Sequence, residues 1–201
     1  MTEKGLKFVD LFAGCGGMTL GLMQAGWSGL FAVEKNPMAF ESIKANFLSS
    51  ESKKRGVTLE WPDYLPREAI AIENLNDNDL KMRLFGKLDL VAGGPPCQGF
   101  SFSGRRNEND VRNALVEAYA AFVLKVRPTL LLIENVPGIL VPHGKKRSSG
   151  SNPGKSYAQR LSSIMSEHYV FRGDVVDAAE FGVPQRRMRF FGVGILREAL
   201  A

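Results

Sequence analysis

The stretch LKFVDLFAGCGG, residues 6–17, decides the fold class. It begins as a short apolar run and ends in a glycine-rich turn. A helical pattern follows, with Met18, Leu22 and Ala25 on one face, and it ends at Gly26. A buried strand that passes through a glycine turn into a helix is typical of the first unit of an open α/β sheet. Glycine suits such a turn because it tolerates positive φ and lets a ligand approach the backbone closely.

Strand and helix patterns alternate along the rest of the chain. This alternation predicts one α/β domain, with a mostly parallel sheet and helices on both of its faces. No internal repeat and no linker divides the 201 residues. We expect strands at 6–12, 30–33, 88–92, 129–133, 169–176 and 189–196, helices at 18–25, 37–47, 113–126 and 157–165, and irregular segments at 49–66 and 141–155, the second of them a mobile loop.

The composition is that of a globular protein with a modest basic excess, 26 Lys and Arg against 21 Asp and Glu, which gives a net charge of +5. This excess permits a polyanionic partner without requiring one. The basic residues gather in clusters that suit phosphate contacts, although the cluster at 145–147 is explained more simply as solvated surface. The clusters are Arg105, Arg106 and Arg112; Lys145 to Arg147; and Arg186, Arg187 and Arg189.

The two cysteines and two histidines exclude several classes of protein. Cys15 and Cys97 cannot form a disulfide framework, and they lack metal-ligand spacing with His143 and His168, so we expect no metal site. No apolar run approaches the roughly 20 residues that span a membrane. The N-terminal residues also lack the pattern of a signal peptide. We therefore expect a protein of a reducing, cytosolic compartment without a membrane contact.

Glu34 follows the second predicted strand, at the edge where open α/β sheets bind ligands. A carboxylate at this position is placed to accept hydrogen bonds from ribose hydroxyls. Residues 14–17 match the dinucleotide fingerprint poorly, so a nicotinamide or flavin cofactor is disfavoured. The glycine turn and Glu34 together indicate a nucleoside-type ligand, and a purely structural turn is the alternative.

Residues 93–101, GGPPCQGFS, follow the predicted strand at 88–92 and carry the strongest catalytic signal. A cysteine on a rigid proline turn at a strand end is presented outward, and nearby arginines favour its thiolate. We therefore interpret Cys97 as a nucleophile. Cys15, by contrast, is expected to be an inert packing residue or a small residue that the glycine turn tolerates.

Two further motifs carry charged groups near strand ends. Glu134 follows the predicted strand at 129–133, which should neighbour the strand before Cys97, and a carboxyl group there needs a partner because burying one alone is costly. It is either a helix cap or ion pair, or a carboxyl with a raised pKa that donates a proton to a heterocycle. Alternation places Arg187 and Arg189 on one face. Two guanidinium groups there can hold a carbonyl and a phosphate together, with an ordinary basic edge as the alternative.

In their order along the chain, these motifs resemble the carbon-5 cytosine-specific DNA methyltransferase family. The resemblance runs from about residue 7 to residue 193. It implies a Rossmann-like S-adenosylmethionine-dependent methyltransferase fold, mostly parallel with a closing antiparallel strand. It also implies an enzyme of DNA methylation, of the restriction-modification or orphan kind, with double-stranded DNA as its partner. The matching segments are Asp10 to Gly17, Glu34, Gly94 to Ser101, Asp110 to Leu115, Glu134 to Val136, and Gln185 to Arg189.

The family chemistry implies a role for each motif. The target cytosine is flipped out of the duplex, and the Cys97 thiolate adds to carbon 6 of its ring. Glu134 hydrogen-bonds N3, carbon 5 takes the methyl group and loses its proton, and elimination frees the cysteine. Arg189 holds the base carbonyl, and Arg187 supports the site. The implied cofactor-binding residues are Asp10, Phe12, Gly14, Gly16, Gly17, Glu34, Ile72, Pro95 and Leu115.

The chain departs from the family at the adenine end of the cofactor site. An Asp-Ile or Asp-Val pair usually reads the adenine amino group, and the best local counterpart here is Ala71-Ile72, with Asp63 a weaker substitute. Lys35 stands where an aromatic ring often stacks on the adenine. The contacts to the adenine are therefore the least defined part of the predicted site.

The family continues beyond the arginine motif into a target-recognition domain and a C-terminal segment beside the cofactor. We therefore expect residues 1–201 to form a single catalytic domain that is incomplete at its C-terminus. A truncated chain, a split enzyme with a complementary subunit that carries the recognition domain, and a degenerate remnant are the explanations. Alone, such a chain should bind DNA weakly and expose apolar surface beside its first strand. A tRNA cytosine-5 methyltransferase of the same family and a DNA- or cofactor-binding fragment without turnover are the alternative functions.

Replacing Cys97 with serine should lower the methylation rate by about a thousandfold or more, the scale expected for the loss of a covalent nucleophile. The matched change Cys15→Ser should alter the rate little. The measurement is the incorporation of labelled methyl groups into cytosine-containing duplexes. Equal losses from the two changes, or covalent trapping by a 5-fluorocytosine duplex that survives Cys97→Ser, would contradict the assignment of Cys97.

Overall fold

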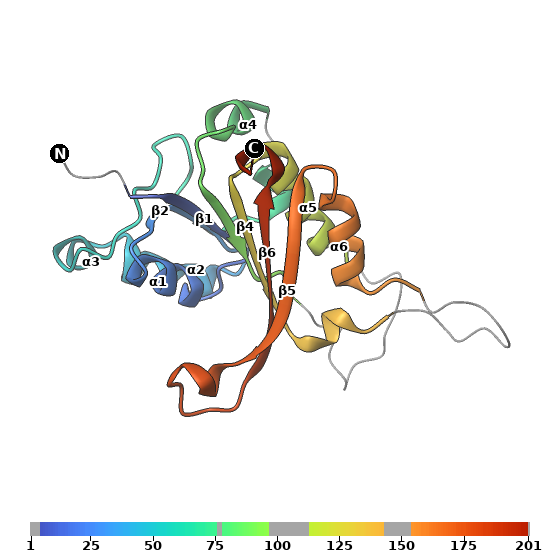
Figure 1. Ribbon diagram of the computed structural model, residues 1–201. Helices are drawn as coiled ribbons and strands as arrows, with labels where there is room; N and C mark the ends of the chain where they lie inside the picture. The colour runs from blue at the N-terminus through green and yellow to red at the C-terminus, as the bar shows by residue number, and fades with distance from the viewer. Residues whose placement is uncertain (1–4, 76–77, 97–112, 143–153, 201) are drawn as a thin grey trace, which may run out of the picture.

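The described strands form one mixed sheet (Figure 1). The computed structural model describes residues 5–75, 78–96, 113–142 and 154–200. The strand order is β2-β1-β3-β4-β6-β5, in which β2, β1, β3 and β4 pair in parallel and β6 runs antiparallel to both of its neighbours. This arrangement confirms the predicted sheet, mostly parallel and closed by an antiparallel strand. The strands are β1 (Lys7–Leu11), β2 (Ser28–Val33), β3 (Leu90–Gly93), β4 (Leu130–Asn135), β5 (Tyr169–Asp177) and β6 (Met188–Leu196).

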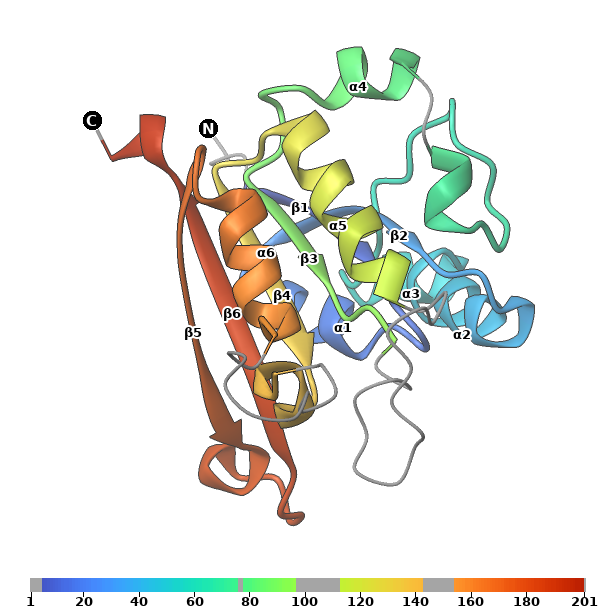
Figure 2. The same ribbon diagram turned by 90° about the vertical axis from the view of Figure 1, so that its right-hand side faces the viewer.

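Helices cover both faces of the sheet (Figure 2). Helix α1 lies on one face, where Met18 and Leu22 pack against the cluster that contains Phe8, and α5 and α6 lie on the other. The helices predicted at 37–47, 113–126 and 157–165 are confirmed with the same bounds. The longer helices are α1 (Gly17–Gln24), α2 (Pro37–Phe47), α5 (Asn113–Val126) and α6 (Tyr157–Met165).

Local capping explains why two of these helices begin where they do. The Asn36 side chain accepts hydrogen bonds from two backbone N–H groups in the first turn of α2, and Pro37 fits that turn because its missing N–H would have no partner there. At α6, Ser156 and Gln159 form a reciprocal capping box. Because these signals are local, the sequence pattern is enough to predict both helices.

The structure contains short elements that the sequence pattern does not predict. The expectation of an irregular segment at 49–66 is wrong in part, because α3 (Ser50–Lys54) lies within it. Its five residues are too few to show a helical period, and its start is capped by the Ser49 side chain. Residues 143–153 of the expected loop lie outside the described part of the chain. The remaining short elements are η1 (Ile72–Leu75), α4 (Asn78–Leu84), η2 (Pro137–Leu140), η3 (Ala178–Phe181) and η4 (Arg197–Ala199), where η marks a 3₁₀ helix.

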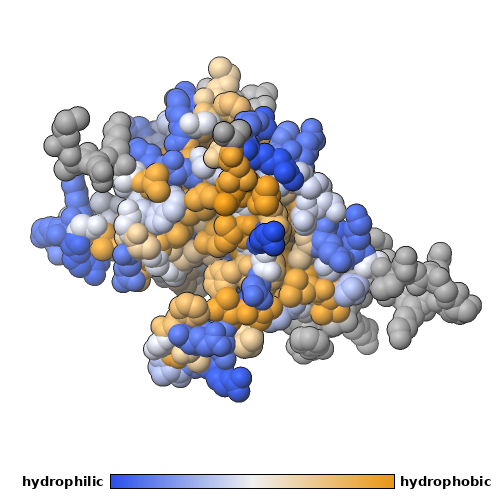
Figure 3. All heavy atoms as spheres, in the orientation of Figure 1, coloured by the Kyte–Doolittle hydropathy of each residue, from blue (hydrophilic) through white to orange (hydrophobic). Residues whose placement is uncertain are grey.

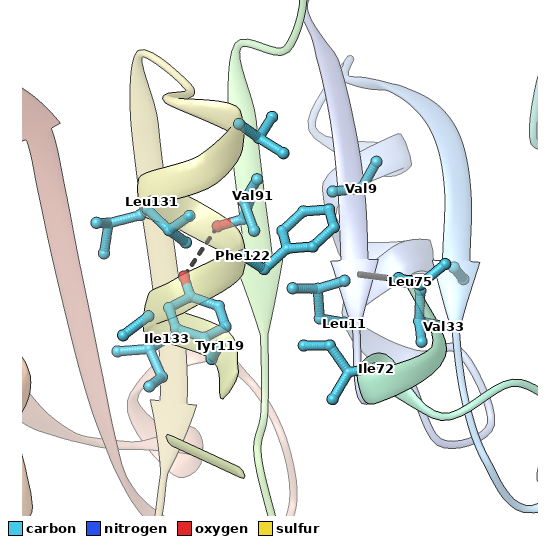
Figure 4. Packing of buried hydrophobic residues seen from close by; sticks show 14 of the residues in the cluster. Val9, Leu11, Val33, Ile72, Leu75, Val91, Tyr119, Phe122, Leu131 and Ile133 are labelled. Atoms are coloured by element: carbon cyan, nitrogen blue, oxygen red, sulfur yellow. Dashed lines mark hydrogen bonds between the residues drawn. The ribbon is translucent and has the colours of Figure 1, made fainter. Parts of the chain in front are cut away.

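Tyr119 on α5 is fully buried against the middle of the sheet (Figure 4). Its hydroxyl lies 3.0 Å from the carbonyl oxygens of Val91 on β3 and Leu132 on β4, and it can donate its proton to either. At the end of β3, a Cβ on Gly93 would lie 2.9 Å from Cε2 of Tyr119 and 3.0 Å from the Leu11 carbonyl oxygen. Only glycine fits this packing without displacement. Helix α5 therefore fixes the strand end from which the proline-cysteine segment departs.

The sheet face that carries α1 is left partly uncovered at β6. Val193 and Phe191 are exposed on this face, opposite Leu132 and Glu134 of β4, whereas Phe8 on β1 is fully buried. Figure 3 shows apolar residues gathered over the strands in the centre of the molecule. Exposed apolar side chains therefore lie on β6, and Leu6, directly before β1, is exposed as well. Within the described ranges, no helix combines the length and apolar character needed to cross a membrane.

Gly93→Ala should destabilise the fold by about 1–3 kcal/mol, the usual cost of extra atoms in a packed core. The added methyl would press on the Tyr119 ring and on a backbone oxygen of β1. Gly21→Ala is the matched control: Gly21 is exposed within α1, a Cβ there meets nothing within 4 Å, and alanine should stabilise the helix by up to about 1 kcal/mol. Denaturant unfolding measures both changes, and a Gly93→Ala variant as stable as the natural chain would refute this account of the β3 end.

Candidate active site

The predicted site residues that the structure describes lie along one edge of the sheet, at the carboxyl ends of the parallel strands. Strand β1 leads into the turn at Phe12, β2 into Glu34 and β3 into Gly94, and Glu134 is the penultimate residue of β4. Ligands bind at this edge in open α/β sheets. Outside the described residues lie Cys97 and the basic clusters Arg105, Arg106, Arg112 and Lys145 to Arg147.

The turn after β1 has the backbone of a ligand-binding loop. Gly14 has a φ of 57° and Gly16 a φ of 88°, and Gly16 caps the start of α1 at Gly17. Phe12, although not a glycine, has a φ of 60°. A bulky residue in this left-handed region is strained, and such strain clusters at functional sites. The turn is thus fixed by three left-handed residues within five positions.

Glu34 joins the ends of β1 and β2. Its Oε2 accepts a hydrogen bond of 2.9 Å from the Gly14 backbone N–H, and its Oε1 accepts one of 2.8 Å from the Asn36 N–H. A carboxylate has about four lone-pair sites, so two of them are left for other donors. The neighbouring Lys35 is exposed and offers no aromatic face. The geometry therefore leaves Glu34 oriented and still able to accept hydrogen bonds from hydroxyl groups.

Asp10 lies behind the turn and is buried. Its Oδ2 accepts a hydrogen bond of 2.7 Å from the Thr19 hydroxyl on α1, whereas its Oδ1 is buried with no hydrogen-bond partner among the described residues. Burial raises the pKa of Asp10 to about 7, the hydrogen bonds from Thr19 oppose this rise, and the charge of Glu34 adds to it. Asp10 therefore ties β1 to α1 on either side of the turn and stays largely protonated below neutral pH.

The remaining predicted cofactor residues are buried near the same edge. Ile72 begins η1 and packs into the main core, and the Ile70 N–H donates to the Glu34 carbonyl oxygen at 2.8 Å, which brings this segment beside Glu34. Leu115 is buried near the start of α5, and Asp63, the weaker counterpart for the adenine contact, is exposed. The structure thus favours the 70–72 segment over Asp63 as the neighbour of Glu34.

Asn135 links β4 to the proline segment after β3. Its Nδ2 donates to the Pro95 carbonyl oxygen at 3.0 Å, and its Oδ1 accepts from the Val136 backbone N–H at 2.9 Å. Both the Asn135 side chain and Pro95 are buried. This buried cross-link, which sequence reasoning missed, fixes the residues that precede Cys97 relative to the end of β4.

Glu134 lies between the proline segment and β6. Its Oε1 forms an ion pair of 2.9 Å with Nε of Arg189, and a Cβ on Gly94 would lie 3.2 Å from its Oε2. Burial raises the pKa of Glu134, and the charges of Arg189 and Arg187 oppose this rise. The sequence left an ion pair and a proton donor as alternatives. The geometry shows the ion pair together with a carboxyl that burial biases toward its protonated form.

A pocket of about 550 Å³ opens beside this ion pair. Its polar side consists of Glu134, Arg187 and Arg189, so the two arginines expected on one face do meet at one place. Its other side is apolar and comes from β5, β6 and the hairpin between them. These apolar residues are Val176, Ala178, Phe181, Val183 and Phe191.

Asp177 shapes the hairpin that carries the arginine motif. Its Oδ1 accepts from the backbone N–H groups of Arg187 at 2.8 Å and Ala179 at 3.2 Å, and Oδ2 lies 3.4 Å from Nε of Arg186. These hydrogen bonds lower the pKa of Asp177. No sequence signal identifies Asp177, because Arg186 and Arg187 are nine and ten residues away across a turn whose shape the sequence does not give.

Cys15 is exposed at the glycine turn. Its interpretation as an inert packing residue is therefore wrong, and the alternative, a small residue that the turn tolerates, fits its position. Considering only the residues that the structure describes, no group of three or more His, Cys, Asp or Glu side chains could hold a metal ion.

The chain matches the family model for C-5 cytosine-specific DNA methylase over residues 6–200. It is 34% identical over 189 residues to the type II methyltransferase M.AgeI of Thalassovita gelatinovora, covering 94% of this chain and 39% of that protein. It is 33% identical over 195 residues to the type II methyltransferase M.DdeI of Desulfomicrobium norvegicum, covering 94% of this chain and 40% of that protein. The chain thus spans about two fifths of the length of these relatives.

Solved structures share the fold. A candidate DNA modification methyltransferase encoded within an E. coli prophage superimposes with a TM-score of 0.71 at 28% identity, over 97% of this chain and 48% of that chain. The S. pombe Dnmt2 methyltransferase superimposes with a TM-score of 0.64 at 22% identity, over 95% of this chain and 51% of that chain. The second likeness is one of fold alone.

The raised pKa of Asp10 should make stability depend on pH. The unfolded chain releases this proton near the ordinary value of 3.8, and the folded chain holds it up to about 7. The stabilisation that comes with the bound proton is complete below about pH 4 and is lost as the pH rises through about 7. The free energy of unfolding should therefore fall over this window relative to Asp10→Asn, by up to about 1.4 kcal/mol for each pKa unit of difference.

Denaturant unfolding at a series of pH values measures the difference between the natural chain and Asp10→Asn, which mimics the protonated acid. Exposed Asp63 supplies the control, since Asp63→Asn should leave the pH dependence unchanged. A pH-independent difference between the natural chain and Asp10→Asn would mean that Asp10 ionises normally in the fold.

Proposed function

Because the chain belongs to the C-5 cytosine-specific DNA methylase family, we propose that it forms the catalytic domain of an enzyme that methylates carbon 5 of cytosine in duplex DNA, with S-adenosylmethionine as the methyl donor. The observation that carries this proposal is the Glu134–Arg189 pair, which lies against Gly94 in the segment that leads to Cys97. The type II relatives support DNA as the substrate, a restriction-modification role and, with that role, the bacterial cytoplasm as the compartment.

The residues at the ends of β1 and β2 fit a nucleoside cofactor. A Cβ at Gly14 or Gly17 would meet nothing within 4 Å, so the turn leaves open space beside its backbone. Glu34 is oriented by two backbone N–H groups and keeps lone pairs for ribose hydroxyls. S-adenosylmethionine supplies an electrophilic methyl group when bound. The proposed contacts are those of Phe12, Gly14, Gly16, Gly17, Glu34, Ile72, Pro95 and Leu115, with Asp10 acting from behind the turn through Thr19.

The proposed chemistry begins at Cys97. Its thiolate sulfur forms a bond with carbon 6 of cytosine, and the electron pair of the 5,6 double bond becomes available at carbon 5. The Glu134 carboxyl donates its proton to N3 as negative charge develops there. After carbon 5 has taken the methyl group it loses its proton to solvent, the sulfur–carbon bond breaks, and Glu134 recovers its proton from N3.

Arg189 has two successive partners in this proposal. Without substrate it neutralises the Glu134 carboxylate. With a cytosine in place, its guanidinium donates to the base carbonyl, and Arg187 remains beside it in the pocket. Glu134 then loses its nearest positive charge while its burial persists, so its pKa rises and the protonated form needed at N3 is favoured. Substrate binding thus favours the protonated form of the Glu134 carboxyl group.

Glu134→Gln should lower the methylation rate by about 10²- to 10⁴-fold, the contribution of a positioned acid, because an amide cannot transfer a proton to N3. The affinity for S-adenosylmethionine should change little, because Glu134 lies at β4, whereas the glycine turn and Glu34, the proposed ribose contact, lie at the ends of β1 and β2. Single-turnover methylation and calorimetric titration of the cofactor measure the two effects. Exposed Glu41→Gln is the matched control and should alter neither.

Three outcomes would count against the proposed function. One is stabilisation of the fold by nicotinamide dinucleotide but not by S-adenosylmethionine. Another is methylation by Glu134→Gln at the natural rate. The third is binding of cofactor and DNA by the natural chain with no methyl transfer from any preparation, which would favour a binding module.

A further inference from the structure

The hairpin tip, residues 178–187 between β5 and β6, projects beyond the edge of the sheet where the candidate site lies (Figure 1). Strand β6 is antiparallel to both β4 and β5, so β5 ends at the same edge as β4. The tip therefore leaves the sheet beside the end of β4 and returns into β6 just before Arg189. A DNA duplex whose cytosine reached Glu134 would therefore lie next to this tip.

The tip has a fixed shape. Asp177 accepts hydrogen bonds from the backbone N–H groups of Ala179 and Arg187, so one buried carboxylate holds both ends of the tip. The Ala178 N–H also donates to the Arg187 carbonyl oxygen at 3.1 Å. Gly182, with a φ of 83°, closes the 3₁₀ turn at its apex. A surface held in this way loses little conformational entropy on binding.

The tip exposes apolar side chains next to positive charge. Phe181 is 73% exposed, and Val183 is exposed beside it. Both line the pocket whose polar side contains Glu134. The Arg186 side chain is 90% exposed, although its Nε lies 3.4 Å from Oδ2 of Asp177. An aromatic ring that is this exposed on a rigid tip contributes little to the hydrophobic core of the described fold.

We propose that the hairpin tip contacts the DNA duplex beside the extruded cytosine, with Phe181 packed against the base step that extrusion leaves open. Extruding a base costs a few kcal/mol of stacking and pairing. Apolar side chains that pack against unstacked base steps offset such costs in proteins that deform DNA. Arg186 suits a backbone phosphate next to this contact. The inference rests on the proposed function, because it needs a base that leaves the duplex.

Duplex DNA fits this surface better than a protein partner does. Arg186 pairs with Asp177, and Arg189 pairs with Glu134. The Arg186 side chain is nevertheless 90% exposed, so a DNA phosphate can reach its guanidinium. The apolar residues lead into a pocket that ends at the proposed catalytic acid, so the occupant must reach that acid as well.

Two duplexes that differ at one position test the proposal. In one duplex a cytosine is paired with guanine, and in the other the same cytosine is mismatched with adenine and is easier to extrude. The natural chain should bind the mismatched duplex more tightly. Phe181→Ala should reduce this preference by roughly 5- to 150-fold, the range for losing an aromatic contact with a base. Its affinity for the matched duplex should change less than twofold, and Phe181→Leu should fall between.

The controls separate this contact from general DNA binding. Phe85→Ala removes a ring that is 50% exposed at the opposite edge of the sheet, before β3, and should leave the preference intact. Arg186→Ala should weaken binding to both duplexes equally. Fluorescence anisotropy gives the affinities, and thermal unfolding checks that each variant is folded.

Each contrary result has a distinct meaning. If the natural chain prefers the mismatch and Phe181→Ala keeps the full preference, the inference about the tip is overturned while the proposed function stands. If the natural chain binds neither duplex, or binds both alike, base extrusion is not its activity and both proposals fall. A dimer that Phe181→Ala dissociates without any change in DNA binding would identify the tip as a self-association surface and would also overturn the inference.

Discussion

Tyr119 reaches across β3 and β4, and its hydroxyl lies between the carbonyl oxygens of Val91 and Leu132. Its ring also packs on Gly93, where no larger residue fits. Asn135 adds a second tie a few residues further on, through its hydrogen bond to the Pro95 carbonyl oxygen. The backbone that leads to Cys97 and the strand that carries Glu134 are therefore joined twice. The fold must hold these two segments in a fixed relative position, because a misplacement of reacting groups by about 1 Å can lower a reaction rate by a factor of about a hundred.

The carboxyl groups of buried Asp10 and half-buried Glu134 both have a raised pKa, and they differ in what surrounds them. Asp10 accepts hydrogen bonds from Thr19 but faces no positively charged partner, and its Oδ1 has no partner among the described residues, so its environment disfavours the charged form. Glu134 meets a guanidinium that can be drawn away by a substrate. The first arrangement suits a structural tie between β1 and α1. The second suits a group that must change its protonation during a reaction cycle.

Local patterns in the sequence were enough to predict the elements with a clear period or cap. The helices at α2, α5 and α6 carry their own signals, and the strand ends follow from the apolar runs. The short helix α3 has too few residues for a period. The order of the motifs along the chain also predicted which side chains meet, since parallel strands bring their ends to one edge.

Contacts between distant residues could not be predicted in the same way. The side chains of Asn135 and Asp177 bind backbone groups of distant residues. Every residue has such backbone groups, so no sequence motif identifies the partner. The exposure of Cys15 and Phe181 depends on how the turn and the hairpin fold, and neither apolar period nor composition reports it. An ion pair of Glu134 was one of the alternatives that the sequence left open, but its partner Arg189 could not be named, because sequence alone does not give the register of β6 against β4.

That register has a consequence for how the chain tolerates insertions and deletions. Arg189 faces the same side of the sheet as Glu134 because β6 pairs antiparallel with β4, Phe191 opposite Glu134. A one-residue change of length between Met188 and Phe191 would turn every side chain before it to the opposite face and carry the guanidinium away from the acid. A one-residue change within the turn at 182–185 would leave the register of β6 against β4 intact and would alter only the hairpin tip. Insertions and deletions that preserve the Glu134–Arg189 pair should therefore be tolerated in the turn but not from Met188, the first residue of β6, onward.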